Sequence, residues 1–166
     1  IWFRNTWAWD KNEPRPFMRS GSTHGELVIQ LNHPRYSERW LYVEGTPELL
    51  FTENETNFHR LYGVDNPSPY VKDAFHEAIV QKNQAALNPA NIGTKAAAHY
   101  DLTLQAGDTV QVRMRLTNMG FATSLKGPFG EEFDQIFSDR LREADEFYST
   151  IIPDELSNDA KNVMRQ

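Results

Sequence analysis

Two glutamates placed two residues apart are the positions best suited to carboxyl catalysis. Glu53 and Glu55 follow an apolar run, Glu48–Thr52, with the length and composition of a strand. On a strand such residues point to the same side, with α-carbons about 6.5 Å apart. Inverting glycosidases use an acid and a base about 6.5–9.5 Å apart, one on each side of the bond. Same-side glutamates meet only the distance, so we favour the alternative that they are solvated or anchor a loop, and we assign no catalytic residue.

A second polar group lies on a helix predicted over Tyr70–Val80. Lys72, Asp73 and His76 fall within it and would line a cleft if the helix bordered one, although such residues are also ordinary on a helix surface. The five histidines have no metal-binding spacing, and there is no calcium loop or glycine-rich phosphate loop. The sequence therefore predicts neither a metal site nor a cofactor.

Composition narrows the class of protein. The chain has 166 residues, 39% of them hydrophobic, and no cysteine, which excludes disulfides and thiol chemistry. Residues 129–166 carry 4 basic and 10 acidic side chains, whereas residues 1–128 carry 13 of each. The chain thus lacks the positive charge expected for binding nucleic acid, and no apolar run is long enough to cross a membrane. The cellular location stays open, with the cytoplasm slightly favoured.

Strand-like alternation before residue 128 predicts a mainly β domain over residues 1–128. Strands are expected at Ile1–Trp9, Glu26–Leu31, Arg39–Val43 and Glu48–Thr52. Asp10–Gly25, with two prolines and two glycines, is expected to be a loop. Thr94–Gln105 and Thr109–Thr117 alternate with period two around a glycine-containing turn, which predicts an antiparallel hairpin. Its apolar face must find a second layer, so spacing alone predicts a β-rich domain followed by helices.

Five aromatic residues within these runs have two interpretations. We expect them to pack in the core, because aromatic side chains bury large areas there. The alternative is an exposed platform on which sugar rings stack. The residues are Trp2, Trp7, Trp9, Trp40 and Tyr42.

Residues 129–166 have helical spacing. Apolar side chains from Phe133 to Ile151 recur every three, four or seven positions, which predicts an amphipathic helix of about five turns. Pro153 would end this helix, and Ser157 would cap a second one. We expect the sequence to be part of a longer chain, because it opens in what looks like the middle of a strand and closes two turns into a helix.

Several stretches, in this order, resemble large bacterial proteins described as glucosidases, which are similar to glycoside hydrolase family 63 and the mannosylglycerate hydrolase group. The resemblance runs from Ile1 to Gln166. The stretches are residues 2–9, 39–42, 50–57, 68–76 and 93–100.

The resemblance implies a β-sandwich of the supersandwich kind, incomplete at its N-terminus, followed by a helical linker over residues 129–166. An (α/α)₆ barrel that holds the catalytic residues would come next, so this chain alone is expected to be inactive. The sandwich would brace the barrel, and six residues would lie at the rim of its sugar pocket: Glu53, Asn54, Glu55, Lys72, Asp73 and His76. The alternative is an independent carbohydrate-binding or structural interaction module.

Overall fold

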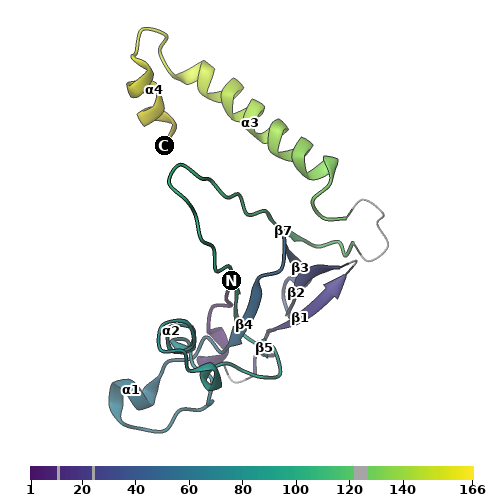
Figure 1. The fold of residues 1–166 in the computed structure, drawn as a ribbon, viewed down its shortest axis with the longest axis vertical. Coiled ribbons are helices and arrows are strands. Elements are labelled where there is room, and N and C mark those ends of the chain that lie inside the picture. The colour runs from purple at the N-terminus through teal and green to yellow at the C-terminus, as the bar shows by residue number, and fades with distance from the viewer. Residues whose placement is uncertain (11, 24, 122–126) are drawn as a thin grey trace. The chain divides into compact units, whose positions relative to one another are not determined.

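Two antiparallel sheets provide the regular core of the first of two units in the computed structural model (Figure 1). The structure describes residues 1–10, 12–23, 25–121 and 127–166. The units comprise Ile1–Ser124 and Leu125–Gln166 and are described separately. Within the described residues there are seven strands, all in the first unit. The predicted mainly β fold is confirmed.

One sheet has five strands and the other has two. The larger has the order β5-β1-β2-β3-β7, with β1 at Phe17–Thr23, β2 at Glu26–His33, β3 at Ser37–Val43, β5 at Ile92–Gly93 and β7 at Met114–Thr117. The smaller pairs β4 at Glu48–Thr52 with β6 at Lys95–His99. The predictions of β2, β3 and β4 are confirmed.

The predicted loop over Asp10–Gly25 is wrong across β1. Phe17–Thr23 pairs with β2 over its full length, from Phe17 opposite Asn32 to Thr23 opposite Glu26. Gly25, in the connection, has φ of 82°, a conformation that glycine adopts without strain. The prolines therefore precede the strand, and the last glycine turns the chain after it.

The predicted hairpin between residues 94–105 and 109–117 is also wrong. β6 pairs with β4, and β7 pairs with β3, so the two arms belong to different sheets. Between them, residues 100–113 form an extended excursion with no assigned strand (Figure 1). The expected turn is present, because the Asp108 N–H donates to the Gln105 carbonyl oxygen at 3.0 Å. Alternation identified extended arms but not their partners.

The hydrophobic core joins the two sheets. Its central buried side chains come from the five-stranded sheet and from β4 and β6: Met18, Ile29, Leu31, Phe51 and Ala96.

The predicted strand over Ile1–Trp9 is wrong for most of its length, since only Trp2 makes a β-bridge, to Lys95, and Thr6–Ala8 is a 3₁₀ helix.

Helices cap one end of the first unit and make up the regular structure of the second. In the first unit, α1 spans Phe58–Tyr62, α2 spans Ala74–Ile79, and Gln84–Ala86 is a 3₁₀ helix. In the second, α3 spans Glu131–Ile151 and α4 spans Asn158–Arg165, with Ser157 accepting a capping hydrogen bond from the Ala160 N–H. The predicted C-terminal amphipathic helix is confirmed. Among the described residues, no helix has the length and apolarity to cross a membrane.

Candidate functional site

The carboxylate of Glu55 is a structural acceptor for the N-terminal segment. The Asn5 amide donates to Glu55 Oε2 at 2.8 Å, and the Trp7 indole N–H donates to Oε1 at 2.8 Å. Arg15 Nη2 lies 3.3 Å from the same Oε1 atom. Three donors from a segment some 40 to 50 residues away in sequence therefore converge on one carboxylate.

Glu53 is used in a similar way. Its Oε2 atom accepts from the Thr94 hydroxyl at 2.6 Å and from the Thr94 N–H at 3.1 Å. Arg15 Nη2 lies 2.8 Å from that oxygen, so one guanidinium nitrogen contacts both Glu53 and Glu55. A cation thus bridges the two carboxylates, whereas an inverting pair acts from opposite sides of a bound sugar.

Asn54 completes this arrangement. Its side-chain amide donates to the Phe3 carbonyl oxygen at 2.9 Å, and its backbone N–H donates to the Thr94 hydroxyl at 2.8 Å. We call Glu53, Asn54 and Glu55 the carboxylate anchor, because together they hold the first residues of the chain against the β5–β6 junction. The loop-anchoring interpretation fits this geometry better than catalysis does.

Lys72 and Asp73 lie beside the carboxylate anchor. The Lys72 N–H donates to the Glu55 carbonyl oxygen at 2.9 Å. Asp73 accepts from the Asn57 amide at 3.1 and 3.2 Å and pairs with Arg60 at 3.1 Å. Burial opposes ionisation of Asp73, but the hydrogen bonds from Asn57 and Arg60 outweigh it and lower the pKa of this carboxyl group. Asp73 is therefore a charged structural acceptor.

His76 is the sixth of the predicted rim residues and lies on α2. Its backbone N–H donates to the Asp73 carbonyl oxygen at 3.0 Å, while its side chain is exposed. The structure thus brings Glu53, Asn54 and Glu55 into one network and places Lys72 against it. The sequence alone did not identify the side chains that donate hydrogen bonds to the two carboxylates. Asn5, Trp7 and Arg15 carry no local signal, because their partners are distant in sequence.

The five aromatic residues divide between the core and the surface. Tyr42 is only 1% exposed, as expected for core packing, whereas Trp2 and Trp9 are 60% and 72% exposed. Core packing is therefore wrong for these two tryptophans. Trp7 and Trp40 are half-buried.

Trp2 borders an aromatic groove of about 290 Å³. The Phe3 and His33 rings are 5.3 Å apart, and the His33 and Tyr36 rings are 4.7 Å apart. Burial lowers the pKa of His33, and its Nδ1 atom accepts from the Arg35 N–H at 3.1 Å. A neutral His33 then carries its proton on Nε2, as a hydrogen-bond donor.

Metal ligands do not gather within the described ranges, where no group of three or more His, Cys, Asp or Glu side chains could hold an ion. His24, one of the five histidines considered above, lies outside the described residues.

The chain is similar over its whole length to YMR196W, an uncharacterized protein of Saccharomyces cerevisiae, with 35% identity over 196 residues. It spans 18% of the length of that relative. No protein-family model matches the chain, and no solved structure matches it significantly.

Proposed function

We propose that this chain is a non-catalytic β-sandwich portion, with its linker helix, of a larger inverting glycoside hydrolase resembling α-glucosidases. The order of the five sequence stretches that resemble glucosidases supports this proposal, as does the mainly β fold. The yeast relative, of which this chain spans 18%, offers ample length for a separate catalytic domain. In this arrangement the sandwich braces an (α/α)₆ barrel in which the sugar is cleaved.

The observation that carries the non-catalytic role is the position of Arg15. One guanidinium nitrogen contacts Glu53 Oε2 at 2.8 Å and Glu55 Oε1 at 3.3 Å. The carboxyl pair best placed by sequence spacing is therefore committed to holding the N-terminal segment. Lys72 and His76 remain exposed and are our candidates for the rim of the sugar pocket in the larger enzyme.

The test is hydrolysis of α-glucosides by this chain and by the full-length yeast relative. We expect turnover by the relative and none by this chain. A relative lacking the region aligned with this chain should lose activity, because its catalytic domain would lose its brace. Turnover by this chain alone, or an inactive but folded full-length relative, would contradict the proposal.

The exposure of Trp2 and Trp9 favours a second candidate, an independent carbohydrate-binding module. Exposed tryptophan rings stack on the C–H face of sugars, and Trp2 lies beside the aromatic groove. Binding of a sugar by this chain, with no activity in the full-length relative, would favour this candidate.

A further inference from the structure

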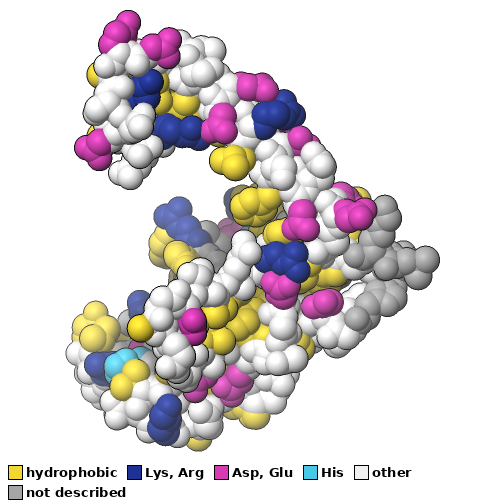
Figure 2. All heavy atoms as spheres, turned by 45° about the horizontal axis from the view of Figure 1, so that its top comes forward, with side chains coloured by type: hydrophobic (Ala, Val, Ile, Leu, Met, Phe, Trp, Pro, Cys, Tyr) yellow, Lys and Arg dark blue, Asp and Glu magenta, His cyan; other side chains and the backbone are white. Residues whose placement is uncertain are grey.

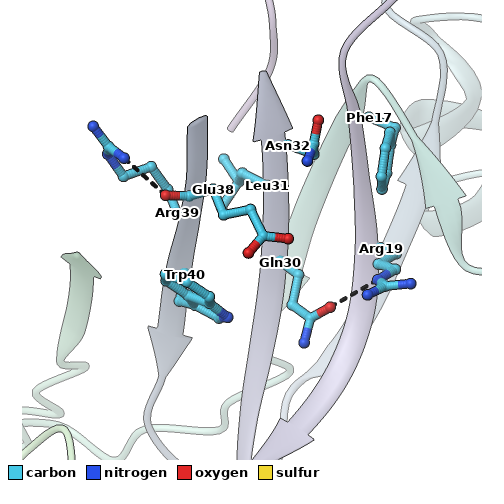
Figure 3. Close-up of a pocket in the computed structure, with 8 residues that line it drawn as sticks. All are labelled: Phe17, Arg19, Gln30, Leu31, Asn32, Glu38, Arg39 and Trp40. Carbon is cyan, nitrogen blue, oxygen red and sulfur yellow. Dashed lines mark hydrogen bonds between the residues drawn. The ribbon is translucent and has the colours of Figure 1, made fainter. Parts of the chain in front are cut away.

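Six side chains on the outer face of the five-stranded sheet form two parallel rows (Figure 3). Arg19, Gln30 and Trp40 lie opposite one another on β1, β2 and β3, in register. Phe17, Asn32 and Glu38 make the neighbouring row. Cross-strand partners and residues two apart share one face of a sheet, and the core residue Met18 points to the other. We call these six residues the outer platform.

The register fixes the dimensions of the outer platform. Adjacent strands are about 4.8 Å apart, and residues two apart on a strand are separated by about 6.5 Å, so the two rows span roughly 10 by 7 Å. All six positions lie inside paired strands. The platform is therefore a preorganised surface of the size of one or two sugar rings.

Its polar groups suit a ligand with many hydroxyl groups. Arg19 Nε donates to Gln30 Oε1 at 2.7 Å, which orients both side chains and leaves the Gln30 NH₂ group as a donor (Figure 3). Asn32 adds an amide, and Glu38 adds a carboxylate acceptor. Donors and acceptors therefore alternate over a short distance, as neighbouring hydroxyl groups of a sugar require.

The aromatic side chains and the net charge of the outer platform also suit an uncharged sugar. Phe17 and Trp40 are half-buried, so each ring keeps part of its surface in solvent, and Gly120 lies next to the Trp40 ring. Arg19 and Glu38 balance in charge, which does not favour a phosphorylated or strongly acidic ligand. In Figure 2, acidic and basic side chains are interspersed over the drawn surface of each unit.

We propose that the outer platform binds a neutral oligosaccharide, with Trp40 stacking on a pyranose ring and Gln30 and Glu38 binding its hydroxyl groups. This inference deepens the proposed function and rests on it for the class of ligand. It places sugar binding on β1–β3, away from the carboxylate anchor and from the predicted rim residues.

The experiment titrates this chain with maltotriose and, separately, with mannobiose, and follows the indole N–H signals of the tryptophans by NMR. We expect a saturable shift of the Trp40 signal with one of these sugars, with a Kd on the order of 1 mM. Trp40→Ala should abolish binding, and Gln30→Ala should weaken it about tenfold. Tyr62→Ala is the matched control, because Tyr62 is an exposed aromatic residue on α1, outside the platform, and this variant should bind like the unmodified chain.

Three results would overturn the inference. These are no shift with either sugar, a shift of Trp2 alone, which would move the site to the aromatic groove, or unchanged binding in the folded Gln30→Ala variant. The activity of the full-length relative separates this failure from that of the proposed function. An active relative together with a platform that binds no sugar would contradict only the platform.

Discussion

At the scale of single residues, polar side chains in this chain hold segments together. Glu55 receives hydrogen bonds from Asn5 and Trp7, and Glu44 receives two from Arg113 Nε, at 2.9 and 3.0 Å. The spacing of Glu53 and Glu55 was visible in the sequence, and so was the option of an anchor. Their donors were not, because no local pattern relates residues separated by 40 or more positions.

Replacing Glu55 with alanine should destabilise the first unit. The Asn5 amide and the Trp7 indole would lose their acceptor in a half-buried site, at a cost of about 1–3 kcal/mol. Urea unfolding followed by far-UV circular dichroism measures the change. Glu48→Ala is the control, because its exposed pair with His99 should contribute less than about 0.5 kcal/mol. Equal stability of the two variants would refute the anchoring role.

Glu44 should make the stability of the first unit depend on pH. The hydrogen bonds from Arg113 lower the pKa of Glu44 below its ordinary value of 4.5. Because the folded-state pKa is depressed, the contribution is fully present above pH 4.5 and is lost as pH falls through the folded-state pKa. Glu44→Gln should therefore lose less stability than the unmodified chain between pH 7 and about pH 3. Urea midpoints at both values measure the difference, and parallel losses would contradict the prediction.

At the scale of elements, the crossing from β5 to β6 depends on close approach of two backbones. Gly93 is buried, and a Cβ atom there would lie 2.8 Å from the Thr52 carbonyl carbon and closer still to the oxygen. The Thr94 N–H donates to that same Thr52 oxygen at 3.1 Å. Only glycine fits where the chain passes from one sheet to the other.

Gly93→Ala should therefore destabilise the sheets by at least about 1–3 kcal/mol, since the clash is with backbone and cannot be relieved by a side-chain rotation. Gly120→Ala is the matched control, because its nearest neighbour would be Trp40 Cε2 at 3.7 Å, an ordinary contact. Thermal unfolding of both variants is the measurement. A Gly93→Ala variant as stable as the control would show that the backbones can separate.

The elements also show what sequence patterns can predict. Runs of apolar residues identified β2, β3 and β4, and helical spacing with a proline stop identified α3. β1 was missed because Met18 is the single fully buried hydrophobic residue in a strand rich in serine and threonine. Its pairing with β2 defines it, and that is a property of two segments. The sequence also could not show that β6 and β7 belong to different sheets, because strand pairing depends on two segments.

At the scale of the whole molecule, each unit leaves apolar surface exposed. On α3 the exposed fractions are 68% for Phe137 and 62% for Leu141, although both belong to the predicted apolar stripe. A helix with this pattern is usually stabilised by packing that stripe against a partner. The mainly β architecture and the C-terminal helix could be predicted from sequence, but a partner for the apolar stripe of the helix could not.

The double substitution Phe137→Ser and Leu141→Ser removes two exposed apolar side chains from the stripe of α3. It should reduce binding of a hydrophobic dye and self-association, since exposed apolar patches promote both. Dye fluorescence and analytical ultracentrifugation measure these effects. Unchanged dye binding and unchanged self-association would contradict the prediction.

The excursion over residues 100–113 is fastened at its base. The Tyr100 hydroxyl donates to the Glu44 carbonyl oxygen at 2.6 Å, and the Glu44 N–H donates to the Arg113 carbonyl oxygen at 3.1 Å. Both stems are thus held by one residue, while the tip at Gly107 is exposed. Because Glu44 holds both stems, a protease that cuts the tip would leave two pieces that migrate together under native conditions. For the same reason, this tip is a suitable place to insert a tag or a fluorescent reporter.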